Sequence, residues 1–270
     1  MEKYSFKNNY FDIGQILESG QYFLYKKQND KYIVNINDNL LEISTINNIT
    51  NITISKALFD KNIYNFFDIN TDYDKIIKEI NKSFPELKKY TNFGKGIRFL
   101  NQDFLLVAIS FIISQNNNIG RIKKSIEYLT DMYGENNNFP TLEKLKTLTQ
   151  EDFRKAGVGF RDKYLFNFVQ KITKQQIDFL KNMNSKEAFE YLIQFQGIGP
   201  KVANCIILFG LHKRDVFPID THIKKIMQDI YFEGKETSIK KIEEFALKKF
   251  KDKASYIQQY LFYWSIKHKE

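Results

Sequence analysis

Apolar and polar side chains alternate along residues 22–55, in short stretches that are separated by turns rich in Asn and Asp. A period of two turns one face of each stretch toward a core, as in an antiparallel sheet. The pattern predicts strands at residues 22–26, 31–37, 40–44 and 51–55. From Asp72 onward the apolar positions recur every three to four residues, which is typical of helices.

The helical pattern continues to the end of the chain and includes one stretch, residues 104–113, that is almost wholly apolar. That stretch is too short to cross a bilayer and predicts a buried helix. Helices are predicted at residues 73–83, 103–114, 119–133, 141–147, 163–174, 185–193, 201–211, 223–230, 238–250 and 255–268. The expected fold is α+β, with an antiparallel sheet domain over residues 1–70 packed on a larger helical body over residues 71–270.

Two glycines, a proline and a lysine begin one of these helices. Gly197 and Gly199 allow a tight turn, and Pro200 suits the first helical position. The free amides at this helix start favour an anion such as a phosphate. Lys201 lies in the first turn, where the helix dipole disfavours an ammonium and so favours the neutral, nucleophilic amine. The simpler interpretation is a helix start that carries a solvent-exposed lysine.

Asp220 follows Lys201 by nineteen residues and precedes Thr-His-Ile-Lys-Lys-Ile, so it is predicted to cap the N-terminus of a helix. Capping and catalysis are compatible. A carboxylate that accepts amide hydrogen bonds stays ionised, and an ionised carboxylate stabilises a sugar that develops positive charge.

An asparagine triplet follows the buried apolar helix, and Arg121 comes three residues after it. An asparagine that reaches into a duplex, such as Asn116, can offer both donor and acceptor to a base whose partner has been flipped out. The alternative is an ordinary Asn-rich loop, since Asn is abundant along most of this chain.

The last predicted helix carries Gln258 and Phe262 on one face, because the two residues are four positions apart. A planar amide beside an aromatic ring can form the wall of a pocket for a planar base. Cys205 lies four residues beyond Lys201 and should share its face. Simple core packing is the alternative interpretation for both Phe262 and Cys205.

Taken in order, these segments resemble the helix-hairpin-helix DNA glycosylases with a Gly/Pro loop and a catalytic Asp, and within them the 8-oxoguanine DNA glycosylases. The resemblance covers most of the chain, with the hairpin at about residues 190–212. The matching segments are Ser19-Gly20-Gln21-Tyr22-Phe23, residues 114–121, Gly157-Val158-Gly159-Phe160-Arg161, residues 195–201, Gly210, Pro218-Ile219-Asp220 and Gln258-Gln259-Tyr260-Leu261-Phe262. Two departures are Phe195-Gln196-Gly197, where such hairpins usually read Leu-Pro-Gly, and Phe160 in place of a tyrosine.

The resemblance implies a bifunctional enzyme in which Lys201 attacks C1′ of the damaged nucleotide and forms a Schiff base, while Asp220 stabilises the sugar. It implies that the Gly20 carbonyl accepts the N7 proton that only the oxidised base carries. The remaining roles it implies are base recognition by Cys205, Gln258, Phe262 and Phe111, contact with the opposite strand by Asn116, Arg121, Phe160 and Arg161, and phosphate binding by Gly197, Gly199 and His222. No metal or other cofactor is expected to be required, and a cation at the hairpin carbonyls would be structural.

Net charge agrees with a DNA-binding role. The chain carries a formal charge of +9, and residues 89–270 hold 30 basic against 20 acidic side chains, whereas residues 1–88 hold 11 against 12. A basic helical half is what phosphate contacts require, although a general enrichment in Lys and Asn would also produce it. The single cysteine excludes an internal disulfide framework and a four-cysteine iron–sulfur cluster.

Two other functions stay open. One is a non-catalytic helix-hairpin-helix DNA-binding protein, which would need the glycines but not Lys201, Asp220 and Gln258 together. The other is a glycosylase for alkylated or mispaired bases, which would keep Asp220 without ordinarily needing Lys201. In each case the expected partner is duplex DNA, and the expected protein is a cytoplasmic, nucleoid-associated monomer without a membrane segment.

Overall fold

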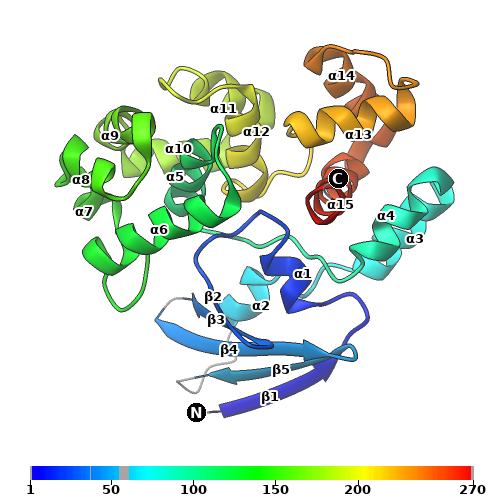
Figure 1. The fold of residues 1–270 in the computed structure, drawn as a ribbon, viewed down its shortest axis with the longest axis horizontal. Coiled ribbons are helices and arrows are strands. Elements are labelled where there is room, and N and C mark those ends of the chain that lie inside the picture. Colours follow the sequence, from blue (N-terminus) through cyan, green and yellow to red (C-terminus); the bar gives the residue numbers. More distant parts are fainter. Residues whose placement is uncertain (1, 37, 55–60, 269–270) are drawn as a thin grey trace.

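The computed structural model describes residues 2–36, 38–54 and 61–268. Within them, an N-terminal antiparallel sheet is followed by a body built from helices (Figure 1). The sheet has the order β1-β5-β4-β3-β2. The N-terminal elements are β1 (Glu2–Lys7), α1 (Ile13–Leu17), β2 (Lys26–Gln28), β3 (Lys31–Ile36), β4 (Asn39–Ile46), β5 (Ile49–Ile54) and α2 (Lys61–Phe66). The α+β fold class predicted from the sequence is confirmed.

The helices of the body lie in two groups on either side of the molecule, above the sheet in the view of Figure 1. One group contains α5 (Phe104–Ser114), α6 (Ile119–Tyr133), α7 (Leu142–Lys146), α8 (Gln150–Lys155), α9 (Asp162–Lys171), α10 (Lys174–Asn182), α11 (Ser185–Leu192) and α12 (Pro200–Phe209). The other contains α3 (Tyr73–Ser83), α4 (Lys88–Phe93), α13 (Thr221–Tyr231), α14 (Ile239–Phe250) and α15 (Ala254–Lys267). Each group has its own hydrophobic cluster, and the sheet shares the cluster of the first group.

The sheet turns one row of aliphatic side chains toward the helices. Leu41 pairs with Val34 on one neighbouring strand and with Ile54 on the other, and Ile43 pairs with Ile52. All five side chains are buried. Such cross-strand rows stabilise a half-buried sheet, and here α1 and α2 cover the row (Figure 1).

The strand predicted at residues 22–26 is wrong, because β2 begins only at Lys26. Tyr22 and Phe23 are both buried although they are consecutive, so the chain has left the alternating geometry of a strand. Their rings pack on Phe66 of α2 and Phe111 of α5, respectively. The predicted strand ends at Asn37 and Ser55 lie outside the described residues.

The helix predicted at residues 163–174 corresponds to α9, which already ends at Lys171, and α10, which begins at Lys174, was not predicted. Thr173 accepts a hydrogen bond from the Gln176 N–H, and the Gln176 side chain accepts one from the Thr173 N–H, so this capping box starts α10. The edge strand β1 and the short helices α1, α2, α4 and α8 were not predicted from the periodicity. Short elements present too few apolar repeats to be detected in this way.

Glu18 connects the sheet to the C-terminal helix α15 through hydrogen bonds to residues of both. Its carboxylate accepts hydrogen bonds from Lys27 at 2.8 Å, Tyr32 at 2.7 Å and Lys267 at 2.7 Å. Burial alone would raise the pKa of Glu18, but the bonds from Lys267, Lys27 and Tyr32 outweigh it and lower the pKa to about 2. This carboxylate therefore stabilises the fold only in its ionised form.

We expect Glu18→Gln to weaken the dependence of stability on acid pH. Because the folded pKa is below its ordinary value of 4.5, the stabilisation is complete above that pH and is lost as the pH falls toward 2. Urea unfolding at pH 7 and pH 3 should show a smaller difference for the variant than for the wild type. Glu190→Gln, at an exposed position, is the control. Equal pH dependence in wild type and Glu18→Gln would contradict the assignment.

Arg98 is the largest of the fully buried side chains, with 2% of its surface exposed. Its guanidinium donates to the carbonyls of Tyr10 and Phe67 and to those of Asp68, Ile69 and Thr71. It also lies over the Tyr73 ring, with Cζ 4.1 Å from the ring centroid. One side chain thus holds together the segment that leads from the sheet into the helical body.

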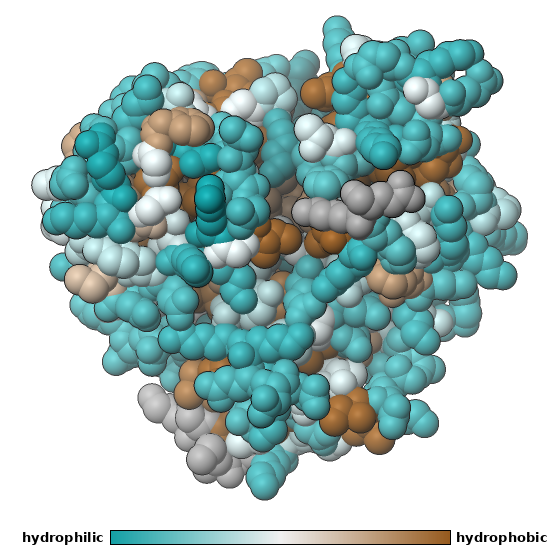
Figure 2. Space-filling model, in the orientation of Figure 1, coloured by the Kyte–Doolittle hydropathy of each residue, from teal (hydrophilic) through white to brown (hydrophobic). Residues whose placement is uncertain are grey.

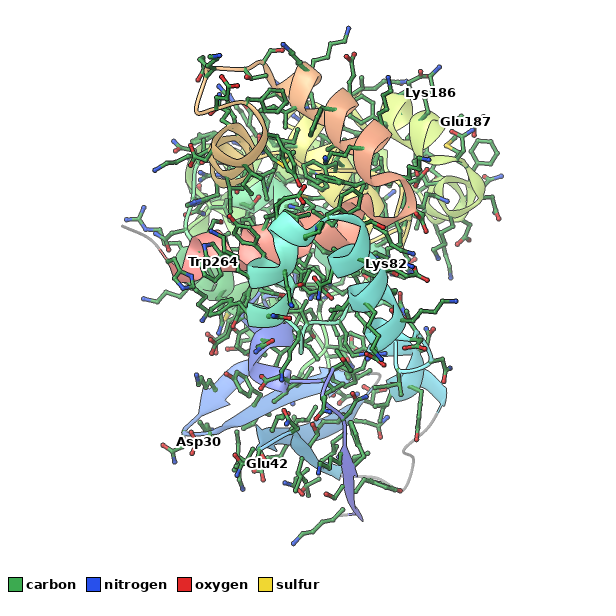
Figure 3. All side chains as sticks on the ribbon, turned by 90° about the vertical axis from the view of Figure 1, so that its right-hand side faces the viewer. Asp30, Glu42, Lys82, Lys186, Glu187 and Trp264 are labelled. Atoms are coloured by element: carbon green, nitrogen blue, oxygen red, sulfur yellow. The ribbon has the colours of Figure 1, made fainter. Side chains whose placement is uncertain are left out.

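The outer surface is strongly charged, as Figure 3 shows for Asp30 and Glu42 on the sheet and for Lys82, Lys186 and Glu187 on the helices. Among the described residues, no helix combines the length and the apolar character that spanning a membrane would require.

Candidate active site

Lys201 and Asp220 line the same hollow, at the N-terminal ends of α12 and α13. Seven residues that the sequence singled out as catalytic or base-contacting lie together there. The lining consists of Gly20, Phe111, Lys201, Cys205, Phe209, Pro218, Asp220, Gln258, Gln259 and Phe262. The fold therefore assembles one site from segments as far apart in the chain as residues 20 and 262.

The Lys201 side chain turns into this hollow. Gly199 caps α12 and Pro200 occupies its first turn, which places Lys201 at the helix start as predicted. Its Nζ donates to Ser114 Oγ at 3.3 Å and lies 4.9 Å from the centroid of the Phe111 ring. The amine thus shares the hollow with Asp220 and faces the apolar ring of Phe111, and it does not extend into open solvent.

Asp220 caps α13, as predicted, and its Oδ1 accepts a hydrogen bond from the Ile223 N–H at 2.8 Å. The cap fixes the carboxylate at the positive end of the helix dipole. Nearby, burial raises the pKa of the Cys205 thiol to about 11, with Lys201 lowering it and Asp220 raising it. Cys205 is therefore a neutral thiol at pH 7.

The buried amide of Gln258 has an unsatisfied atom in this hollow. Gln258 is 5% exposed, and its Oε1 has no hydrogen-bond partner among the described residues. An unpaired buried acceptor is costly, so such an atom indicates a ligand that donates to it. Gln258 is buried and its side chain lines the hollow, as expected for a residue that binds a polar ring there.

The hollow is closed by Phe262 in this structure. Its free volume is about 30 Å³, which is room for one or two water molecules rather than for a purine. Gly20 has φ +75°, and a Cβ placed on it would lie 2.6 Å from Cε1 of Phe262. The ring therefore rests directly on the Gly20 backbone, and only glycine fits beneath it.

A wider hollow of about 370 Å³ opens next to the first and shares Gly20, Phe111, Lys201, Asp220 and Phe262 with it. Its rim includes Asn117 and Asn118 of the asparagine triplet and His222 of α13. Figure 2 shows hydrophobic atoms exposed in the middle of one face of the molecule, between hydrophilic surfaces on both sides.

Asn116, Phe160 and Arg161 form a second group outside the hollow. Asn116 is exposed and has φ 46°, in the left-handed region. Arg161 is 7% exposed, and its guanidinium donates to the carbonyls of Asn116, Gln115 and Val158. Phe160 is 54% exposed, with the Arg161 guanidinium 4.4 Å from its ring centroid. Arg161 thus braces the Asn116 turn, and Arg121 is exposed at the start of α6.

The hairpin glycines differ in what surrounds them. Gly197 has φ +89°, and a Cβ on it would lie 2.4 Å from Cγ of Tyr164, so both conformation and space require glycine. Its carbonyl accepts a hydrogen bond from the Gln115 side chain at 2.8 Å. A Cβ on Gly199 would meet no heavy atom within 4 Å, so the helix start is open to a ligand.

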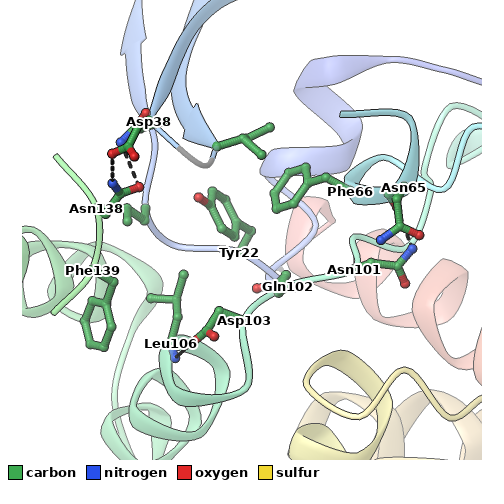
Figure 4. Close-up of a pocket in the computed structure, with 13 residues that line it drawn as sticks. Tyr22, Asp38, Asn65, Phe66, Asn101, Gln102, Asp103, Leu106, Asn138 and Phe139 are labelled. Atoms are coloured by element: carbon green, nitrogen blue, oxygen red, sulfur yellow. Dashed lines mark hydrogen bonds between the residues drawn. The ribbon is translucent and has the colours of Figure 1, made fainter. Parts of the chain in front are cut away.

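Another hollow, of about 540 Å³, lies between the sheet and α5 (Figure 4). It contains neither Lys201 nor Asp220, and several of its amides bond within the protein, including Asn138 to Asp38 at 2.6 Å and Asn101 to the Asn65 carbonyl at 2.6 Å. Its size alone does not make it the reaction site.

Ser114 and Gln259 are among the residues at the site to which the sequence assigned no role. Ser114 accepts the hydrogen bond of Lys201, and Gln259 lines the smaller hollow beside Gln258. Both stand inside segments that carry the family resemblance, but neighbours on a helix point in different directions. Only the packing shows that Gln259 and Gln258 both reach the hollow.

Two family models match the chain. The model described as 8-oxoguanine DNA glycosylase, N-terminal domain, matches residues 3–105. The model of the HhH-GPD superfamily of base excision DNA repair proteins matches residues 109–252.

Individual relatives agree with these matches. The crystal structure of Clostridium acetobutylicum 8-oxoguanine glycosylase/lyase in complex with double-stranded DNA superposes with a TM-score of 0.91 at 34% identity, covering 100% of this chain and 99% of that one. A probable N-glycosylase/DNA lyase of Methanothermobacter thermautotrophicus is 30% identical over 77% of this chain and 74% of its own length. The N-glycosylase/DNA lyase OGG1 of Arabidopsis thaliana is 32% identical over 61% of this chain, which spans about half (49%) of that relative. The chain therefore belongs to the helix-hairpin-helix, Gly/Pro-loop and Asp superfamily of base excision DNA repair proteins, in its 8-oxoguanine DNA glycosylase family.

Proposed function

We propose that the protein excises 8-oxoguanine from duplex DNA, opposite cytosine, and then cleaves the strand as a lyase. The observation that carries this proposal is the joint presence of Lys201, Asp220 and the unsatisfied Gln258 Oε1 at one hollow. A nucleophilic amine, a fixed carboxylate and a buried acceptor are the groups that this reaction requires. The relatives named as N-glycosylase/DNA lyases support the same reaction.

The flipped base would lie between Phe262 and Cys205, with Phe111 along one side. Gln258 Oε1 accepts hydrogen bonds from the Watson–Crick edge of the purine, and the Gly20 carbonyl accepts the N7 proton of the oxidised base. Because Phe262 now rests on Gly20, its ring must swing away before a purine can enter. Substrate entry therefore includes a rearrangement of this side chain.

Lys201 acts as the nucleophile. Its uncharged amine forms a bond to C1′ while the glycosidic bond breaks, and the base leaves with the electron pair and takes up a proton. The adduct then loses a proton and opens the sugar ring to an imine. Removal of the C2′ proton expels the 3′ phosphate and nicks the strand. Asp220 stabilises the positive charge that develops on the sugar.

The opposite strand would meet the second group of residues. Asn116 is exposed on its left-handed turn and can fill the gap that the flipped base leaves. Phe160 and Arg121 are exposed and free to contact the orphaned cytosine, whereas Arg161 contributes by holding the Asn116 turn. A direct contact of Arg161 with the cytosine stays a prediction.

Phosphates of the duplex would bind at the open helix start near Gly199 and at His222, on the rim of the wider hollow. We expect the protein to act as a monomer and without a cofactor, since lysine chemistry supplies both steps. A cation at the hairpin would be structural, because it would be held by turn carbonyls and would not contact the reacting atoms.

The test is a panel of damaged duplexes incubated with the protein in the presence of borohydride, which reduces the imine to a stable covalent complex. We expect trapped complexes and nicked strands with 8-oxoguanine opposite cytosine, and none with undamaged guanine. Equal turnover of undamaged guanine would refute the specificity. Release of 3-methyladenine without trapping would indicate an alkylated-base glycosylase, and binding without any turnover would indicate a non-catalytic DNA-binding protein.

A further inference from the structure

The backbone around Gly20 is held by two buried glutamines from distant parts of the chain. Gln259 Nε2 donates to the Ser19 carbonyl at 2.9 Å, and Gln102 Nε2 donates to the Gln21 carbonyl at 2.8 Å. Gln259 is 2% exposed and Gln102 5%. The peptide units before and after the Gly20–Gln21 peptide are therefore both fixed.

The Gln21 side chain links the same turn to residues 98–100 through hydrogen bonds. Its Nε2 donates to Ser19 Oγ at 3.0 Å and to the Arg98 carbonyl at 2.9 Å, and its Oε1 accepts from the Leu100 N–H at 2.9 Å. A buried amide satisfied on both ends has little freedom to move. The turn is thus tied to the segment that Arg98 holds in place.

The peptide between Gly20 and Gln21 is different. Among the described residues, neither the Gly20 carbonyl nor the Gln21 N–H takes part in a hydrogen bond. Gly20 has φ +75° and no Cβ, so on the glycine side of this peptide a reversed orientation meets little steric resistance. Such a reversal would exchange the carbonyl for the N–H at the surface of the base pocket.

The two orientations would select different bases. A carbonyl facing the pocket accepts the N7–H of 8-oxoguanine and repels the N7 lone pair of guanine. An N–H facing the pocket donates to that lone pair and opposes the N7–H. The direction of one peptide unit therefore decides which of the two bases is preferred.

We propose that Gln259 and Gln102 are positioning residues that prevent this reversal, so that the Gly20 carbonyl faces the base and guanine is rejected. The proposal rests on the function proposed above. It concerns how the specificity is maintained, and it assigns no contact between either glutamine and the reacting atoms.

The test measures binding in the Lys201→Gln background, so that no turnover interferes. Three duplexes are compared, with 8-oxoguanine, guanine or 7-deazaguanine opposite cytosine; 7-deazaguanine has neither the N7 lone pair nor the N7–H. In Gln259→Met and in Gln102→Met we expect the preference for 8-oxoguanine over guanine to fall by about tenfold, the value of one hydrogen bond. Guanine should then bind more tightly than 7-deazaguanine. Gln170→Met is the matched control, because Gln170 also donates to a backbone carbonyl, that of Lys146, but at an exposed position.

Equal weakening on all three duplexes would overturn the proposal, since it would show that the glutamines merely support the fold. Unchanged ratios in both variants would overturn it as well. Two variants on opposite sides of the turn keep the test decisive if one of them fails to fold. A parent protein with no preference for 8-oxoguanine would instead refute the proposed function.

Discussion

Lys201→Gln is expected to abolish the borohydride-trapped complex on 8-oxoguanine duplexes and to lower base excision by on the order of 10³-fold or more. Glutamine has nearly the length of lysine but no nucleophilic amine, so it removes the covalent step while leaving the helix start intact. In the described chain Lys201 Nζ donates to Ser114 Oγ, lies near the Phe111 ring and interacts with the Cys205 thiol, but it forms no ion pair, so its loss should not unfold the protein. Gel analysis of trapped complexes and single-turnover kinetics measure the two effects.

Lys186→Gln is the matched control, because Lys186 also lies in the first turn of a helix, α11, but is exposed and lines neither of the two hollows that contain Lys201. It should keep wild-type trapping. If Lys201→Gln still formed the covalent complex, another amine would be the nucleophile and the proposed mechanism would be wrong. Binding of both variants to the lesion duplex, measured in parallel, separates a catalytic defect from a loss of affinity.

The sequence was sufficient to place Lys201 and Asp220, the two proposed catalytic residues, because each stands at a helix start with its own local signal. Gly199-Pro200-Lys201 and Asp220-Thr221 each mark an N-terminus, and the structure caps both helices at those residues. For Gln258 and Phe262, the four-residue spacing of a helix was enough to predict that both side chains lie on the same face of α15. For these positions local rules and the tertiary fold agree, so local patterns predicted them.

Other features depend on packing and left no local signal. Tyr22 and Phe23 continue an apolar pattern that resembles a strand, yet both rings are buried against helices that come much later in the chain. Arg161 reads as a free basic residue in the sequence, but its donors are taken by carbonyls of the Asn116 turn. The closure of the hollow by Phe262 likewise depends on a contact between residues 20 and 262.

Arg98→Leu is expected to produce the largest loss of stability, about 3–5 kcal/mol in the free energy of unfolding. The guanidinium satisfies five carbonyls that are otherwise turned toward one another around a buried site, and leucine would leave them without donors. Burial lowers the pKa of Arg98, but arginine remains charged at pH 7, so the carbonyl oxygens balance a full positive charge. For a chain of this size the midpoint of thermal unfolding should fall by roughly 10 °C.

Lys78→Leu removes a cation whose side chain is 72% exposed and paired with Asp74, and should change stability only slightly. The contrast between the two variants follows from the surroundings of each cation. When the exposed Lys78 is removed, water can solvate Asp74 in its place. The carbonyls around the buried Arg98 are shielded from solvent, so water cannot take the place of the guanidinium. Because the Arg98 carbonyl also accepts from Gln21, the turn that carries Gly20 should loosen along with the fold. A midpoint for Arg98→Leu within 2 °C of the wild type, roughly the effect of a single surface contact, would show that the carbonyls find other donors.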